Sequence, residues 1–295
     1  MESLPLFPLS QNVYWSAPDP ERDRPVLGAV LGTRRTLLVE TGASPAHARQ
    51  FLQAVQSLGG PAPRYAALTH WHWDHVFGSG ALDLPTIAHR ETQRRVAAMA
   101  RLDWRDAALE ARVQAGTDSP FIAKHVKIEL SEAQRAALEI VPPDVIFDER
   151  LEIDLGGRTC QVIHVGGDHS PDSSIVFVPE ERVVFLGDCL YSSSGPAGYR
   201  YTAEGLFPLL DTLEALRADT YLWGHHPRPY SRADFLAEAG LLRRTYEAVA
   251  QAGAEPAAAA ERLAAFLKRP LNEDDQDNLE AFLTGMRTGA EWIGF

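Results

Sequence analysis

The segment Thr69-His70-Trp71-His72-Trp73-Asp74-His75 holds three imidazoles and one carboxylate, directly after the mostly apolar stretch 65–69. That stretch predicts a short buried strand. Because alternate residues of an extended backbone share a face, we expect His70, His72 and Asp74 to point one way and the two tryptophans to pack on the other side. Neutral imidazole and carboxylate are the ligands that zinc and similar divalent metals prefer. The segment therefore predicts part of a metal site.

A site for two metal ions needs more ligands than this segment supplies. Two ions about 3.5 Å apart require roughly six or seven ligands between them. Three further candidates stand where predicted strands end: His169 in Gly166-Gly167-Asp168-His169-Ser170-Pro171-Asp172, Asp188 in Phe185-Leu186-Gly187-Asp188, and His225 in Trp223-Gly224-His225-His226. We expect them to complete the site. His164 lies on a predicted strand and is expected to pack or to support a ligand instead of binding metal.

The motifs THWHWDH, GGDHSPD, FLGD and WGHH, in this order, resemble those of the metallo-β-lactamase superfamily of metal-dependent hydrolases over residues 25 to 230. The resemblance implies an α/β fold, a four-layer αββα sandwich with the metals at one edge. It implies two divalent metal ions, Zn²⁺ in first place and Fe or Mn as alternatives. The implied ligands are His70, His72 and His169 for one ion, Asp74, His75 and His225 for the other, and Asp188 as the bridge.

The implied chemistry is hydrolysis. Two cations that share a water lower its pKa towards neutrality, so a hydroxide that bridges the metals can attack a carbonyl or phosphorus. Asp74 is the predicted catalytic residue, because a carboxylate at the site can orient the attacking water and then protonate the leaving group.

Three positions decide how closely the chain follows the family's pattern. Glu40 stands where the family usually has an aspartate that supports a ligand histidine, and we expect the longer side chain to do the same. Cys189 is expected to be a small buried residue and no ligand, because Asp188 already supplies the bridging carboxylate. His225 is favoured over His226 because it directly follows the glycine of the family's Gly-His motif.

The motifs leave the substrate open, since related sites cleave lactams, lactones, thioesters and phosphodiesters. The uncharged Tyr191 and Ser192 stand where some zinc β-lactamases carry a lysine, which disfavours a β-lactam. We therefore expect a small ester, lactone or thioester, contacted by Tyr191, Tyr199 or Arg200. Phosphodiesterase or β-lactamase activity at the same site, and a non-catalytic metal-binding protein, remain the alternatives.

Composition narrows the possible partners. The 28 basic and 40 acidic residues leave a net charge of −12, which disfavours a nucleic-acid partner. No stretch approaches the roughly 18 consecutive apolar residues of a membrane span, so no membrane partner is expected. The start MESLPLFPLS lacks the basic and apolar regions of an export signal, and two cysteines form no disulfide framework. We expect a cytoplasmic protein with a small-molecule substrate.

The chain predicts one elaborated domain. We place a hydrolase domain at residues 1–230, with a helical insert at about 91–138 that breaks at 116–120, and a helical extension at 231–295 packed on the same domain. A helix over 46–58 is predicted from its apolar spacing, with Ser44 as N-cap and Pro45 in the first turn. The C-terminal helices, which we expect to break near Pro256 and Pro270, are the candidate contact of a possible homodimer.

Overall fold

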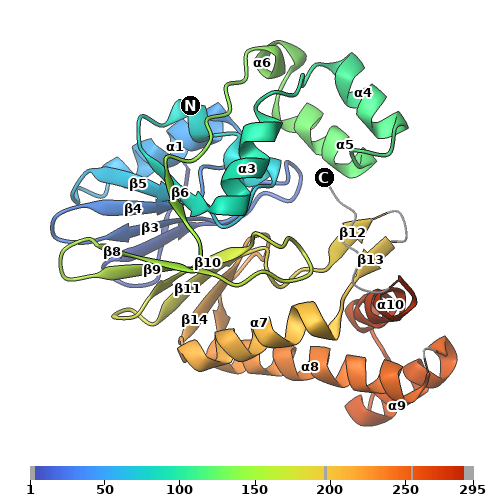
Figure 1. Ribbon diagram of the computed structural model, residues 1–295. Coiled ribbons are helices and arrows are strands. Elements are labelled where there is room, and N and C mark those ends of the chain that lie inside the picture. Colours follow the sequence, from blue (N-terminus) through green and yellow to red (C-terminus); the bar gives the residue numbers. More distant parts are fainter. Residues whose placement is uncertain (1–3, 196–197, 254, 289–295) are drawn as a thin grey trace.

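Two β-sheets lie face to face between two layers of helices (Figure 1). The computed structural model describes residues 4–195, 198–253 and 255–288. The strands of the first sheet, in spatial order, are β1 Phe7–Pro8, β2 Val13–Ser16, β3 Leu27–Leu31, β4 Thr36–Val39, β5 Pro63–Ala67, β6 Thr86–His89 and β7 Val145–Phe147. Those of the second are β15 Tyr230–Ser231, β14 Thr220–Trp223, β11 Val183–Gly187, β10 Ser174–Val178, β9 Thr159–His164 and β8 Arg150–Asp154. A separate hairpin pairs β12 Ser193–Gly195 with β13 Gly198–Arg200.

The helices divide between the two outer layers. On the side of the first sheet are α1 Pro45–Gln56, α2 Trp73–Val76, the 3₁₀ helix η1 Ser79–Ala81 and α3 Arg90–Met99, with α4 Asp106–Gln114, α5 Pro120–Glu129 and α6 Glu132–Ala136 farther from the sheet beyond α3. On the side of the second sheet are α7 Ala203–Leu216 and α8 Arg232–Gln251, and α9 Pro256–Leu267 and α10 Glu273–Thr288 pack against α8. Among the described residues, no helix is both long enough and apolar enough to cross a membrane.

Strand β10 shows why the sheets stack in this way. Its residues Ile175 and Phe177 belong to the apolar cluster that packs against α7 and α8, whereas Val176 and Val178 belong to the cluster between the two sheets. Successive side chains of a strand point to opposite faces, so a strand that is apolar throughout must be covered on both sides. Each buried side chain of this size stabilises the fold by roughly 1.5–3 kcal/mol.

The predicted αββα sandwich is confirmed, as are several local expectations. Ser44 caps α1 by accepting a hydrogen bond from the His47 N–H at 3.1 Å, and Pro45 occupies the first turn. The insert contains α3 to α6, and its chain is interrupted between Gln114 and Pro120, where the break was predicted. The C-terminal helices are interrupted before Pro256 and around Pro270. The division of the chain at residue 230 stays a prediction.

The extended backbone predicted for the segment after β5 was wrong. Strand β5 ends at Ala67, and α2 begins at Trp73, so Asp74 lies in a helical turn and does not share an extended face with His70 and His72. The N–H of His75 donates to the carbonyl of His72 at 3.1 Å, which turns the chain. Both tryptophans are nevertheless buried as expected. Strands β1, β2, β6 and β7 and the β12–β13 hairpin were not predicted.

Candidate metal centre

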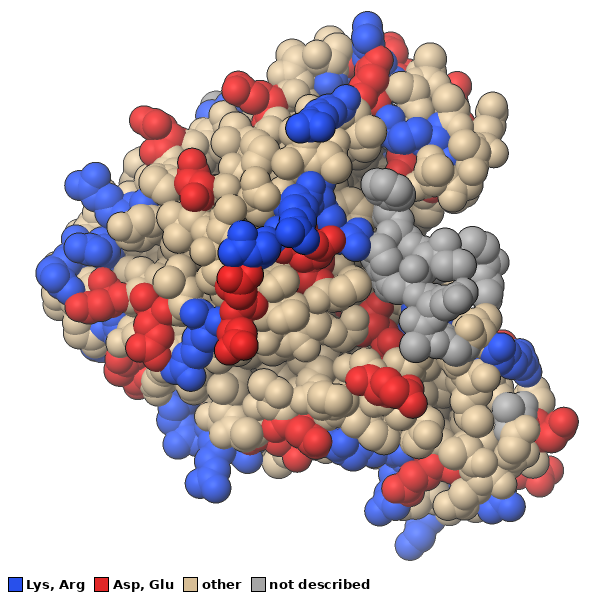
Figure 2. All heavy atoms as spheres, in the orientation of Figure 1, with Lys and Arg blue, Asp and Glu red and all other residues tan. Residues whose placement is uncertain are grey.

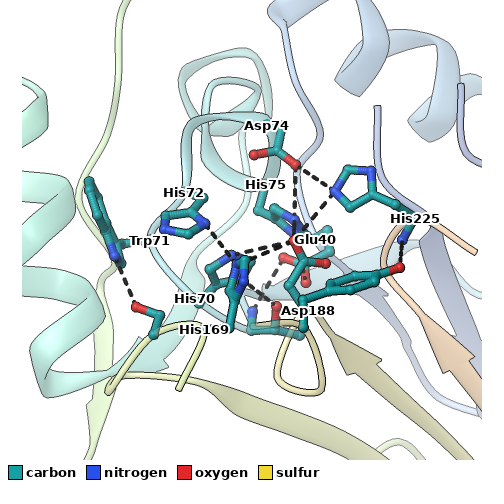
Figure 3. A network of polar contacts seen from close by, with 12 residues as sticks. Glu40, His70, Trp71, His72, Asp74, His75, His169, Asp188 and His225 are labelled. Atoms are coloured by element: carbon teal, nitrogen blue, oxygen red, sulfur yellow. Dashed lines mark hydrogen bonds and ion pairs between the residues drawn. The ribbon is translucent and has the colours of Figure 1, made fainter. Parts of the chain in front are cut away.

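Seven side chains from four loop regions converge at one edge of the two sheets (Figure 3). His70 and His72 follow β5, and Asp74 and His75 lie on α2. The other three follow the ends of β9, β11 and β14 and are His169, Asp188 and His225. Strands β11 and β14 are parallel neighbours, so their carboxyl ends bring Asp188 and His225 to the same edge.

The seven residues form two groups that could each hold a metal ion. One group is His70, His72, His169 and Asp188, and the other is Asp74, His75, Asp188 and His225. Within each group the potential ligand atoms lie within 4.8 Å of one another. This is the division that the family resemblance implied, with the same residue in both groups.

Asp188 stands between the two groups. Its Oδ2 lies 3.9 Å from Nε2 of His70 and 3.5 Å from Nε2 of His169 in the first group. The same oxygen lies 3.5 Å from Nε2 of His75 and 3.4 Å from Nε2 of His225 in the second. One carboxylate thus faces four imidazoles, which is the position that a bridging ligand requires.

The donor set fits divalent cations. His70 Nε2 and Asp188 Oδ1 are buried and have no hydrogen-bond partner among the described residues. Nδ1 of His72 faces Nε2 of His169 at 3.0 Å. Leaving a buried polar atom without a partner costs about 1–3 kcal/mol, so such atoms call for an explanation. A cation bound by these nitrogens and oxygens supplies one, because it accepts their lone pairs.

In the first group, His72 can act as a neutral ligand. Burial lowers the pKa of His72 to about 3, and the neighbouring His169 adds to the effect. The ring is therefore neutral at pH 7 and has a lone pair to donate.

The second group binds protons when no cation is present. Burial opposes the charged form of His225, but Asp188 and Asp74 raise its pKa to about 10. The protonated ring of His225 then carries a positive charge that balances the buried carboxylates of Asp74 and Asp188. A divalent cation would replace those protons, so metal binding at neutral pH should release them.

Supporting residues fix how the histidines point. His75 Nδ1 lies 3.2 Å from Glu40 Oε1, and the other oxygen of Glu40 accepts the Thr69 N–H at 3.2 Å. Nδ1 of His70 lies 3.1 Å from the Thr69 hydroxyl. The expected supporting contact of Glu40 with a ligand histidine is therefore present, and such contacts orient the ring and tune its basicity.

Two glycines permit the close approach of the loops. A Cβ on Gly224 would lie 1.9 Å from Asp188 Oδ1. Gly187 has φ +53°, and a Cβ there would lie 2.1 Å from the hydroxyl oxygen of Thr69. The glycines of FLGD and WGHH are thus required by packing directly against the site.

A bracing network beside the site was missed by the sequence reasoning. Trp71 Nε1 donates to the Ser170 hydroxyl at 3.1 Å, and that hydroxyl donates to Asp172. The Thr92 hydroxyl of α3 donates to the other oxygen of Asp172 at 2.7 Å. The two acidic residues of GGDHSPD were the available signal: Asp168 likewise accepts from the backbone and hydroxyl of Thr202.

A cavity of about 670 Å³ opens over five of the seven residues, His72, Asp74, His169, Asp188 and His225, and its volume suits a small molecule. Tyr191 lines it, and its hydroxyl oxygen accepts the backbone N–H of His225 at 3.3 Å. Tyr199 also lines it and is 65% exposed. Arg200 is buried and lies outside this lining, a position that does not support the expected substrate contact. Asp23, which was not predicted, lines the cavity 3.8 Å from His225 Nδ1.

The remaining candidates lie outside both groups of ligands. His226 Nδ1 lies 2.8 Å from the carbonyl of Arg228, and His164 Nε2 lies 2.8 Å from the carbonyl of Pro171. Cys189 is buried in the apolar cluster under α7. These positions agree with the choice of His225 and with the packing interpretation of His164 and Cys189.

One sequence model identifies the superfamily, and two curated proteins are distant relatives. A sequence model described as "Metallo-beta-lactamase superfamily" matches residues 25–225. The alpha subunit of a 2,4-dinitroanisole O-demethylase from Nocardioides sp. (strain JS1661) is 27% identical, over 74% of this chain and 57% of that protein. An acyl-coenzyme A thioesterase, MBLAC2 of Gallus gallus, is 26% identical, over 63% of this chain and 66% of that protein. The matches thus span less than two thirds of both curated relatives.

The fold has solved counterparts. A metallo-beta-lactamase from Pontibacter korlensis superimposes with a TM-score of 0.58 at 17% identity, over 82% of this chain and 99% of that one.

Proposed function

The chain belongs to the metallo-beta-lactamase superfamily, and from this membership and the geometry of its site we propose that it is a dinuclear metal-dependent hydrolase of a small ester, lactone or thioester. The observation that carries the proposal is the position of Asp188. Its carboxylate is common to two otherwise separate sets of three ligands, as a pair of ions with one shared water requires.

The chain's own residues have defined tasks in this reaction. When bound, two divalent ions would supply an acidified water and positive charge against the substrate's oxygen. Asp74 Oδ2 lies 3.0 Å from His75 Nε2 and 3.1 Å from His225 Nε2. Its Oδ1 is then placed to accept a hydrogen bond from the attacking water and to return the proton to the leaving group.

Tyr191 is the proposed substrate contact at the centre of the cavity. Its hydroxyl oxygen accepts from the backbone of His225, which leaves the hydroxyl hydrogen to be donated. Burial is the main reason that the pKa of Tyr191 is raised, so the phenol stays protonated at neutral pH. A neutral donor at this point can bind a substrate carbonyl oxygen and the negative charge that develops on it. Tyr199 lies at the exposed rim and is proposed as a weaker contact.

We choose carbonyl substrates because of the residues that line the cavity over the metal centre and because of the activity named for one relative. The cavity walls include Tyr191, Ser192 and Ser194, and no lysine or arginine is among the described residues that line it. An anionic phosphodiester or the carboxylate of a β-lactam would lack a cationic side chain as a partner there. The thioesterase activity of one relative is consistent with a thioester substrate.

Metal content and a substrate panel test the proposal together. We expect purified protein to bind two equivalents of zinc and to hydrolyse a lactone, an ester or a thioester in preference to β-lactams and bis-aryl phosphates. The Asp188→Ala variant should lose metal and activity.

Adjacent histidines provide a matched pair of variants. His225→Gln should lose one equivalent of metal, whereas His226→Gln should keep both, because His226 lies outside both groups. One equivalent of metal in the wild type, or full activity of Asp188→Ala after treatment with a chelator, would overturn the dinuclear hydrolase. Loss of zinc in both histidine variants would contradict the ligand assignment.

A further inference from the structure

A second cavity, of about 530 Å³, adjoins the metal centre and differs from it in chemistry. It lies between α3 and the following helices of the insert, and we call it the tryptophan chamber because Trp71, Trp73 and Trp104 line it. These are three of the six tryptophans in the whole chain. Ala98, Met99, Leu102 and Ile122 complete the apolar part of its wall.

The tryptophan chamber and the cavity over the metal centre have walls in common. His72, Trp73 and Ile122 line both of them. His72 is a member of the first group of ligands, so the chamber begins beside the atoms that would hold the first ion. A molecule whose reacting carbonyl is bound at the metal centre can therefore extend into the chamber.

The two cavities suit different parts of one molecule. The metal cavity has polar residues on its wall, among them Asp23, Ser119 and Ser194. The charged groups of the chamber are already engaged: Arg94 Nη1 lies 3.4 Å from Glu91 Oε2, and the guanidinium of Arg95 stacks over the Trp71 ring at 5.3 Å from its centroid. Moving an apolar group out of water into the chamber lowers the free energy of the complex. A polar leaving group stays solvated in the metal cavity.

We infer that the tryptophan chamber binds the acyl chain of the substrate, so that the protein acts on esters or thioesters of medium-chain acids. The inference rests on the proposed function and specifies its substrate class. Each methylene buried in the chamber should raise kcat/KM about threefold to fourfold until the chamber is filled, the increment expected for removing one CH₂ group from water.

Substitutions in and next to the chamber test the inference. Ala98 lies on α3, is exposed to solvent and lines the chamber, so Ala98→Trp fills the space without disturbing the buried core. Leu102→Trp is a second filling variant at a position that is 38% exposed. Ala100→Trp is the matched control, because Ala100 is exposed and does not line the chamber.

The first measurement is hydrolysis of p-nitrophenyl esters from acetyl to decanoyl. In the wild type and in Ala100→Trp, kcat/KM should rise with chain length. In both filling variants the ratio of octanoyl to acetyl kcat/KM should fall at least tenfold. A flat profile in the wild type, or an unchanged ratio in both filling variants, would overturn the chamber as the acyl site while leaving the hydrolase proposal intact.

The second measurement needs no turnover. Bromine-substituted decanoate, whose heavy atom quenches nearby indoles, should quench the tryptophan fluorescence of the wild type and Ala100→Trp with saturation and bind at least tenfold more weakly to Ala98→Trp. If this pattern appears in a protein that hydrolyses no ester or thioester, the chamber stands as an acyl site and the hydrolase proposal fails. Equal binding by all the variants overturns the inference.

Discussion

At the scale of the residue, Glu40 illustrates how strain is used at the site. Its φ of +68° lies in the left-handed region, which costs a residue other than glycine on the order of 1 kcal/mol. The conformation brings one carboxylate against both His75 and the Thr69 N–H. The strained residue thus orients a ligand and holds the loop that carries two more ligands.

Tyr191 should matter for turnover and little for metal binding. Tyr191→Phe removes the hydroxyl and keeps the ring that packs against Trp223. Because the lost donor acts on the charge that develops in the reaction, we expect kcat to fall about 100- to 1,000-fold with two equivalents of metal retained. Steady-state kinetics and metal analysis check this. Unchanged kcat would exclude the hydroxyl from the reaction.

His47 should make folding stability sensitive to acid. Burial, helped by Arg24, lowers its pKa to about 3 from an ordinary value of 6.5, although Asp74 opposes the shift. Between these values the unfolded chain binds a proton that the folded protein does not, so stability is lost as the pH falls through 6.5. From pH 7.5 to pH 5 the loss should be about 2 kcal/mol.

A variant isolates this contribution. His47→Asn keeps an acceptor for the Ala43 N–H, which His47 Nδ1 now accepts at 3.3 Å, but does not titrate. Urea unfolding at pH 7.5, 6 and 5 should give a smaller loss of stability for the variant than for the wild type. Parallel losses in the two proteins would contradict the prediction.

At the scale of the element, the loops of the site are tied to the insert. Asp172, in the loop that also carries His169, accepts from Thr92 on α3 and from Ser170, which in turn binds Trp71. Helix α3 therefore holds both the loop after β5 and the loop after β9. The insert supports the metal centre as well as forming a wall of the tryptophan chamber.

The link through Thr92 can be broken with little change in shape. Thr92→Val leaves a buried oxygen of Asp172 without its partner, which should cost about 1–3 kcal/mol of stability. We also expect several-fold weaker binding of the metal ion nearest His169, because the loop is less well held. Denaturant unfolding and a competing chelator measure the two effects. Thr92→Ser keeps a hydroxyl and serves as the control; equal behaviour of both variants would show that the hydrogen bond is unimportant.

At the scale of the whole molecule, the metal centre joins the two halves of the sandwich. Four of its residues come from the first sheet's side and three from the second. The chain has a net charge of −12. On the face of the molecule that Figure 2 shows, acidic and basic side chains are interspersed. The overall acidity thus gives little information about the substrate.

Removing metal should destabilise the entire fold. Ions that bind only the folded protein stabilise it by about 2.7 kcal/mol at a concentration 100 times the Kd. For a chain of this size we expect a chelator to lower the Tm by about 5 °C or more, and zinc to restore it. Scanning calorimetry measures the shift. Asp188→Ala should show no such shift, and an equal shift in that variant would mean that the chelator acts elsewhere.

The sequence by itself determined the superfamily, the αββα layers and the seven candidate ligands with their division into two groups. The residue types of the motifs indicated a metal site, and the resemblance of the four motifs to one superfamily implied the layers and the division of the ligands. Ser44 and Pro45 likewise predicted the start of α1, because a helix cap depends on neighbouring residues.

Only the tertiary structure decided how those residues meet. The extended geometry predicted for His70 to Asp74 failed because α2 begins inside the motif, where its hydrogen bonds and the buried tryptophans outweigh the alternation of polar and apolar residues. Asp172, Thr92 and Asp23 were missed because their roles depend on contacts between distant segments. The tryptophan chamber depends on the fold in the same way, because its walls come from the loop after β5 and from the helical insert.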